Sequence, residues 1–359
     1  MNKITPPDLQ NSHSQALNLL RFPLAVVILT VHVFGRKPAG FSDSDLPIFN
    51  LVKSFIESFL HWQSVPIYFF ISGFVFFIGL QKWDNGKWIK KLQNRKKSLL
   101  IPYIIWNTLS LLPLIINNTG ELDIKSILSC YWAYNGEITG ISPTGMPINY
   151  PLWFLRDLML IILFTPFLYR LLKKNGKIVL SLFAILWLFK YFTGIKFYIP
   201  TEAMFFFSFG AYMSINAKDM IAEFRKFSKI SVFGFIILGL VSMCLYNSYP
   251  QIFKILKALL IIFGLFFAYN TSVYLLQKGY CKVNNFLSSA SFFIYVSHTL
   301  VFYRVSALLT KLLSPDSDLS WLFLYIMNVV LTSLILVSVF YLMSRYTPKF
   351  LSIVAGRKV

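Results

Sequence analysis

Charged residues are scarce in this sequence. Asp, Glu, Lys and Arg make up only 13% of the 359 residues, whereas hydrophobic residues account for 56% and aromatic residues for 18%. Ordinary water-soluble domains contain about 25% charged residues. The composition therefore excludes a typical soluble domain and indicates a protein whose solvent is a lipid bilayer.

Cysteine is also scarce. Cys130, Cys244 and Cys281 are odd in number and stand at unrelated spacings. A disulfide framework needs paired cysteines, and a structural zinc site needs close pairs of Cys or His. We therefore expect free thiols and no metal site.

Acidic residues are few, with 14 Asp and Glu against 34 Lys and Arg, which gives a formal net charge of +20. Such an excess can indicate a nucleic-acid partner. Here the basic residues occupy short connections between apolar runs and do not interleave with exposed aromatic residues. We expect them to orient helices in a membrane and expect no nucleic-acid binding.

Long apolar runs are what the sequence has in abundance. A run of about 20 residues crosses about 30 Å of hydrocarbon as a helix. The sequence predicts an all-α integral membrane protein with about ten transmembrane helices. The runs begin near Ala16, Val65, Leu99, Tyr150, Ile178, Pro200, Ile230, Leu256, Phe286 and Trp321.

The basic residues divide unevenly between alternate connections. If the N-terminus is inside, the inner segments hold 22 of the 34 Lys and Arg and the outer segments hold 10. Because inner segments of membrane proteins carry the excess of Lys and Arg, this split predicts that both termini are cytoplasmic. We divide the chain into a cytoplasmic tail at 1–15, one transmembrane domain at 16–345 and a basic cytoplasmic tail at 346–359.

Two predicted outer connections are long. Segment 36–62 contains an apolar stretch from Phe49 to Trp62 that we interpret as an interfacial helix. Segment 118–149 is rich in Asn, Gly and Pro and is either a lid or acceptor-binding loop, or an ordinary solvated connection.

The first predicted span carries two ionisable residues. Arg21 and His32 lie about 20° apart around a helix and about 16 Å apart along it, so they share one face. A charged side chain near mid-membrane costs about 2.5 to 3.5 kcal/mol on insertion scales, which makes each a functional candidate. A histidine near neutral pH can act as a general base. The alternative is a snorkelling Arg and an interfacial His.

Five segments carry a family resemblance. The first is the Arg-x10-His arrangement of Arg21 and His32, and the others read VPIYFFISGF (65–74), RKKSLLIPYIIW (95–106), PLWFLRDL (151–158) and SFFIYVSH (291–298). In this order they resemble the motifs of the integral-membrane acyltransferase-3 family, the O-acyltransferases of surface polysaccharides and related glycans. The resemblance extends from residue 16 to about residue 300.

The resemblance implies a ten-helix fold in a bacterial cell membrane. It implies acyl-coenzyme A as donor substrate, usually acetyl-coenzyme A, reached from the cytoplasm. The acceptor would be a hydroxyl of a glycan or lipid-linked saccharide at the outer face. His32 would be the catalytic residue and Arg21 its motif partner. We favour His32 as a general base over an acyl-histidine intermediate, because a base needs no extra nucleophile.

One departure concerns the donor site. Many relatives have an Arg-x-x-Arg pair at the inner end of the third span, whereas here Arg95 is followed three residues later by Ser98. Lys91, Lys96 and Lys97 could supply the missing charge for the phosphates of coenzyme A, although without the bidentate fork of Arg. Alternatively, this basic run is only a positive-inside anchor.

Further polar residues are candidates for a tunnel or an acceptor site. On the ninth span a stripe of Ser and Tyr residues recurs at helical spacing and ends at His298; it either lines the tunnel or binds a neighbouring helix. Ser72 beside Gly73, and Gly210 later in the chain, favour close helix packing. The candidates are Ser72, Trp153, Arg156, Asp157, Ser291, Tyr295 and His298.

Arg156 and Asp157 are adjacent in the sequence. Adjacent helical residues point to different sides, so we expect that they do not simply neutralise each other and that one of them pairs with another helix. This favours a structural role for the pair.

Two other functions would suit a many-helix chain. One is a transporter or flippase for a polysaccharide or a lipid-linked sugar, for which we find no inverted repeats. The other is a structural component of a polysaccharide assembly complex. The acceptor, the length of the acyl group and the oligomeric state are left open.

Overall fold

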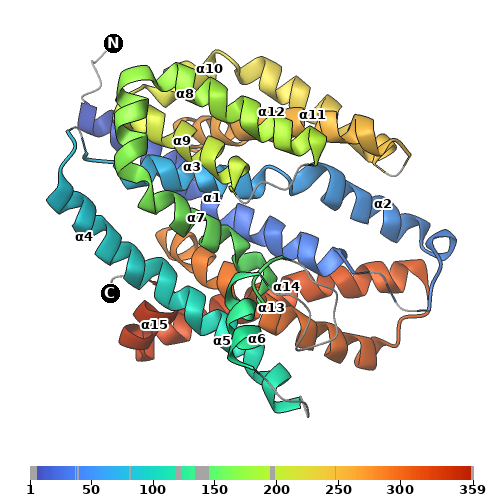
Figure 1. Ribbon diagram of the computed structural model, residues 1–359. Coiled ribbons are helices and arrows are strands. Elements are labelled where there is room, and N and C mark those ends of the chain that lie inside the picture. Colours follow the sequence, from blue (N-terminus) through green and yellow to red (C-terminus); the bar gives the residue numbers. More distant parts are fainter. Residues whose placement is uncertain are drawn as a thin grey trace.

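The structure is a computed structural model that describes residues 6–36, 38, 40–80, 82–117, 123–133, 145–194, 199–246 and 248–356. Within these residues all regular structure is helical, and the long helices run side by side as a bundle (Figure 1). In chain order the α-helices are α1 (Pro6–Phe34), α2 (Pro47–Phe55), α3 (Ser64–Phe77), α4 (Asn85–Arg95), α5 (Ile101–Asn117), α6 (Ile124–Trp132), α7 (Trp153–Leu163), α8 (Thr165–Thr193), α9 (Thr201–Ile215), α10 (Met220–Arg225), α11 (Ser228–Leu245), α12 (Pro250–Gln277), α13 (Asn285–Leu313), α14 (Asp318–Tyr346) and α15 (Pro348–Val354).

Four short helices connect these elements. Two are π-helical turns, η2 (Ile56–Leu60) after α2 and η3 (Lys96–Leu100) between α4 and α5. The other two are 3-10 turns, η1 (Asp43–Asp45) and η4 (Tyr150–Leu152). The helix expected between Phe49 and Trp62 is therefore present, as α2 and η2.

The predicted class, an all-α multi-pass membrane protein, is confirmed. Eight helical stretches among the described residues are long and apolar enough to cross a membrane. The predicted runs near Tyr150 and Pro200 coincide with α7 and α9, which have 11 and 15 residues. These helices are too short to cross about 30 Å of hydrocarbon alone. Helix α8 begins two residues after α7 ends. Pro166 lies in the first turn of α8, where the N–H that proline lacks would have no partner within the helix.

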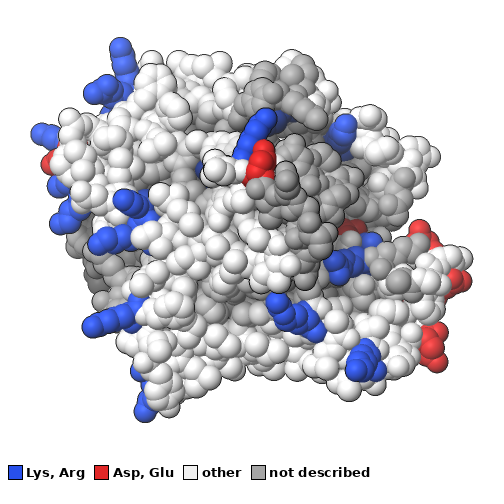
Figure 2. Space-filling view, turned by 60° about the horizontal axis from the view of Figure 1, so that its bottom comes forward, with Lys and Arg blue, Asp and Glu red and all other residues white. Residues whose placement is uncertain are grey.

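The two ends of the bundle differ in charge. Helix α1 begins and α14 ends at the same end, on the left of Figure 1. On the face that Figure 2 shows, many of the Lys and Arg side chains lie along this left edge, and most of the visible Asp and Glu lie towards the opposite edge. The cytoplasmic placement of both termini stays a prediction, because no membrane is present to orient the bundle.

Parts of the predicted segments lie outside the described residues. The lid or acceptor-binding loop at 118–149 is one of them: 118–122 and 134–144 are not described, and α6 lies between them. In the predicted basic tail at 346–359, helix α15 packs on α5, and 357–359 lie outside the described residues.

Helices α3 and α9 approach each other through glycines. A Cβ added to Gly73 would lie 1.9 Å from the carbonyl oxygen of Phe207, and one added to Gly210 would lie 2.0 Å from that of Phe70. Small residues let membrane helices pack with their backbones close together. The prediction that Gly73 and Gly210 permit close packing is confirmed.

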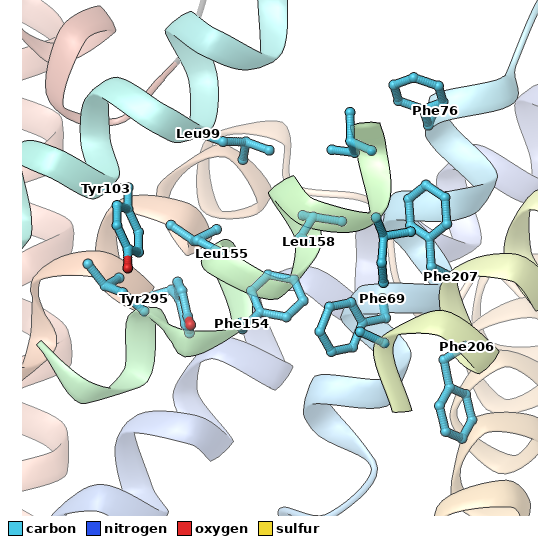
Figure 3. Close-up of a cluster of buried hydrophobic side chains, with 14 of the residues drawn as sticks. Phe69, Phe76, Leu99, Tyr103, Phe154, Leu155, Leu158, Phe206, Phe207 and Tyr295 are labelled. Atoms are coloured by element: carbon cyan, nitrogen blue, oxygen red, sulfur yellow. The ribbon is translucent and has the colours of Figure 1, made fainter. Parts of the chain in front are cut away.

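Helix α7 lies at the centre of the core that carries the site. Its side chains Phe154, Leu155 and Leu158 are buried, and the ring of Phe154 lies 4.5 Å from that of Phe69 on α3 (Figure 3). Tyr295 of α13 packs edge-on against Phe154 at 5.8 Å. This apolar cluster fixes α3, α7 and α13 around the cavity described below.

We predict that Gly210→Ala destabilises the protein by about 1 to 3 kcal/mol, the usual cost of overpacking. The added methyl meets backbone atoms of α3, which no side-chain rotation can move. The measurement is thermal unfolding of detergent-purified protein. Gly86→Ala is the control, because its nearest neighbour is a side-chain oxygen of Asp84 at 3.3 Å and no backbone atom of another helix lies within 4 Å. Equal melting temperatures for both variants would contradict the prediction.

Candidate active site

A cavity of about 390 Å³ opens between α1, α3, α7, α13 and η3. One of its walls is apolar and belongs to α7. The other walls carry polar side chains from α1, α3, α4, η3 and α13, and the C-terminal residues Ala355 and Gly356 also border it. Its polar lining residues are Arg21, Tyr68, Ser72, Arg95, Ser98, Ser288, Ser289, Ser291 and Tyr295.

Arg21 and Arg95 give this cavity a positive charge. Arg21 comes from α1 and Arg95 from the last turn of α4, and their charges repel each other. Within the described residues neither guanidinium forms an ion pair, and no Asp or Glu lines the cavity. Two unpaired guanidiniums are a strong site for an anion such as a phosphate.

The π-turn η3 positions one side of the cavity. It begins directly after Arg95 and includes Ser98 and Leu99, all three of which line the cavity. A π-turn inserts one residue into a helix and so rotates the next helical segment by about 100°. The basic helix α4 and the apolar helix α5 can therefore present different faces to the core.

The predicted lysines lie elsewhere. The ammonium of Lys91 donates to the carbonyls of Phe76 and Ile78, so it ties α4 to the end of α3. Lys96 and Lys97 are exposed and do not line the cavity. Of the predicted donor-binding set, the structure places Arg95 in the cavity and the three lysines outside it.

His32 lies in a second cluster, three helical turns along α1 from Arg21. Its ring packs edge-on against Tyr150, with centroids 4.8 Å apart, and nearly parallel to the ring of His298, with centroids 5.3 Å apart. Tyr150 belongs to η4 and His298 to α13. The half-buried imidazole of His32 thus faces the protein interior.

His298 is held in one tautomer. Its Nδ1 lies 2.7 Å from the carbonyl oxygen of Tyr295 and 3.2 Å from that of Ile294. Because carbonyl oxygens only accept, Nδ1 must carry the proton and Nε2 must be a free acceptor. Nε2 is buried and has no hydrogen-bond partner among the described residues.

Tyr295 connects the cavity to the histidines. It lines the cavity, its ring lies 6.3 Å from that of His298, and its hydroxyl donates to the carbonyl of Pro151. The segment before α7 is also held to α13 by Asn149, which donates to the carbonyl oxygen of Val296 at 3.2 Å. These bonds keep Tyr150 against His32, although His32 itself does not line the cavity.

Arg156 and Asp157 do pair with each other. Arg156 Nε lies 2.9 Å from Asp157 Oδ1, so the prediction that these neighbours do not neutralise each other is wrong. The Arg side chain is long enough to fold back along the helix. Its Nη1 also donates to the carbonyls of Trp132 at 2.6 Å and Gly145 at 3.1 Å, which attaches α6 and Gly145 to α7.

The remaining predicted residues separate into two groups. Ser72, Ser291 and Tyr295 line the cavity of Arg21, whereas Trp153 and Asp157 line another cavity bordered by the ends of α8 and α9. Among the described residues, no three His, Cys, Asp or Glu side chains gather as metal ligands.

Three site residues were not predicted from the sequence. Tyr68 lines the cavity and donates its hydroxyl to the carbonyl of Arg21, and Tyr150 contacts His32. Both stand in or beside quoted motifs, but aromatic residues are so frequent here that neither stood out. Gly356 borders the cavity from the segment predicted to be a basic tail, in which no residue was singled out.

Comparison with known proteins identifies the family to which this chain belongs. The family described as Acyltransferase domain, the acyltransferase-3 family, matches residues 14–345. The succinoglycan biosynthesis protein ExoH of Rhizobium meliloti (strain 1021) is 26% identical over 244 residues, which cover 64% of this chain and 61% of that protein. The match thus spans less than two thirds of the relative's length. No solved structure matches the chain.

The family match covers nearly all of the chain, and the five motifs lie within it. The predicted resemblance is confirmed: this chain belongs to the acyltransferase-3 family of membrane acyltransferases.

Proposed function

We propose that this protein is a membrane O-acyltransferase that moves an acyl group, expected to be acetyl, from acyl-coenzyme A to a hydroxyl of a glycan or lipid-linked saccharide. The observation that supports this most is the pair of unpaired guanidiniums, Arg21 and Arg95, in a cavity that borders the same helix as His32. The similarity to a succinoglycan biosynthesis protein favours a saccharide acceptor.

The donor would bind with its phosphates at Arg21 and Arg95. The hydroxyl of Ser98 stands where many relatives have a second Arg, and it adds a hydrogen-bonding group without charge. Arg21 and His32 are about 16 Å apart along α1. The donor therefore needs an extended arm between its anionic group and its thioester, and acyl-coenzyme A has such an arm.

His32 would act as the general base. Its ring nitrogen accepts the proton of the acceptor hydroxyl while the hydroxyl oxygen attacks the thioester carbonyl. The tetrahedral intermediate then expels the thiolate of coenzyme A, which takes the proton from the imidazolium. In this scheme His298, whose Nδ1 proton is held by the Tyr295 carbonyl, keeps only an accepting nitrogen near His32.

The C-terminal segment would form one wall of the donor site. The indole of Trp106 donates to the carbonyl of Val354 at 2.8 Å, and Gly356 has φ +60°. A Cβ on Gly356 would lie 2.3 Å from the carbonyl oxygen of Ser98. Glycine is therefore what lets this segment close against η3.

We predict that His32→Ala loses acyl transfer by at least about 100-fold, the lower range for removing a general base. The measurement is transfer of label from acetyl-coenzyme A to saccharide by purified protein of unchanged melting temperature. Thr30→Ala is the control, because the Thr30 hydroxyl donates within its own helix, to the carbonyl oxygen of Val26. Full turnover by His32→Ala would reject His32 as the base, and donor-independent sugar movement would favour a transporter.

Arg95→Ala should raise the KM for acetyl-coenzyme A by about 10-fold or more, because hydrogen bonds to charged groups contribute about 1.5 to 3 kcal/mol. Its kcat at saturating donor should change less. Lys97→Ala, at an exposed position outside the cavity, should keep the wild-type KM. An unchanged KM in Arg95→Ala would remove Arg95 from the donor site.

Gly356→Ala should also raise the KM for the donor, because the new methyl pushes the C-terminal segment away from Ser98. Gly279→Ala isolates the backbone strain: Gly279 has φ +71° and no atom within 4 Å of the added Cβ. The measurement is the steady-state KM of both variants for acetyl-coenzyme A. If both shift the KM equally, the contact with Ser98 is irrelevant to donor binding.

A further inference from the structure

We propose that the cavity on the other side of α7 is a saccharide subsite, which holds sugar units of an extended acceptor next to the unit that reacts. This inference rests on the proposed function. The cavity has a volume of about 390 Å³ and is bordered by the start of α7, the end of α8 and the start of α9. Its side chains include three aromatic rings and two carboxylates: Trp153, Trp187, Tyr191, Asp157 and Glu202.

Tyr191 also borders a second cavity of about 500 Å³, whose lining includes Tyr246, Phe253 and Lys257. We call these two cavities, which share Tyr191 as a lining residue, the groove. Two neighbouring spaces suit a chain of several sugar units better than a single small molecule.

The groove carries charges of both signs, because Asp157 and Glu202 stand among Lys190, Lys254 and Lys257. Asp157 pairs with Arg156 at 2.9 Å, and the ammonium of Lys190 donates to the carbonyl of Ile199 at 3.2 Å. The cavity of Arg21, by contrast, has two guanidiniums and no carboxylate among the described residues that line it. An anionic ligand such as coenzyme A is therefore favoured there, whereas the carboxylates and ammonium groups of the groove offer both acceptors and donors to a ligand rich in hydroxyl groups.

Aromatic rings and carboxylates together match a sugar. Ring faces pack on the apolar faces of sugars, and carboxylate oxygens accept hydrogen bonds from hydroxyls. The rings are pre-positioned: Trp187 stacks on Phe205 with centroids 5.6 Å apart and meets Phe206 edge-on at 5.2 Å. Because the ring of Trp187 is already held in place, little conformational entropy of this side chain is lost when a ligand binds.

One end of the groove lies close to His32. Tyr150, which contacts His32, precedes Trp153 by one helical turn. In the second cavity, the ammonium of Lys257 lies 3.0 Å from the ring centre of Trp62. A saccharide whose reacting hydroxyl lies at His32 could therefore extend further units into the groove.

The test compares acceptors of different length. The probes are fragments of the source cells' surface polysaccharide, deacetylated with mild base and sorted by length from single sugars to long oligomers. For the wild type we expect the KM to fall by at least about tenfold from the shortest to the longest fragments. In Tyr191→Ala and in Glu202→Gln this dependence on length should largely disappear. Ile185→Ala, on the exposed side of α8, should keep it.

The outcomes separate the two proposals. Glu202→Gln preserves size and shape, so it tests the groove even if Tyr191→Ala does not fold. Folded variants that keep the wild-type dependence of KM on length would overturn the subsite and leave the acyltransferase proposal intact. Failure of the wild type to acylate any fragment, with donor present, would count against the proposed function itself.

Discussion

The packing of α1 against α13 brings two pairs of candidate site residues together. At one level Arg21 faces the cavity that Ser291 and Tyr295 line, and three turns away the ring of His32 lies against that of His298. Hydrocarbon tolerates neither a guanidinium nor an unsatisfied imidazole at low cost, so these side chains must face protein or a cavity. The same constraint that assembles the bundle therefore concentrates its polar chemistry between these two helices.

Helix α7 divides the interior into two environments. Towards α1 and α13 it presents Phe154, Leu155 and Leu158 to a cavity with two unpaired guanidiniums, and on its other side Trp153 and Asp157 border a groove with charges of both signs. The two spaces therefore offer different electrostatic environments to a ligand. In the proposed function, this separation would keep an anionic donor apart from the saccharide acceptor.

The sequence was informative where physical periodicity or a motif carried the signal. Apolar runs predicted the helices, glycines predicted sites of close helix packing, and the five motifs predicted the family. It was misleading for Arg156 and Asp157, because helical geometry limits the directions of Cβ atoms but not the reach of a long side chain. It also added three lysines to Arg95 as donor-binding residues, whereas Arg95 turns into the cavity and Lys96 and Lys97 stay exposed.

The sequence by itself determined the solvent of this protein, its helical class, its family and the presence of Arg21 and His32 on one helix face. These features depend on composition and on spacing within single segments. Only the tertiary structure decided which residues meet: Arg95 with Arg21, His298 with His32, Gly356 with Ser98, and the groove around Tyr191. The reason is that each of these meetings joins segments far apart in the chain, and local periodicity says nothing about how distant helices pack.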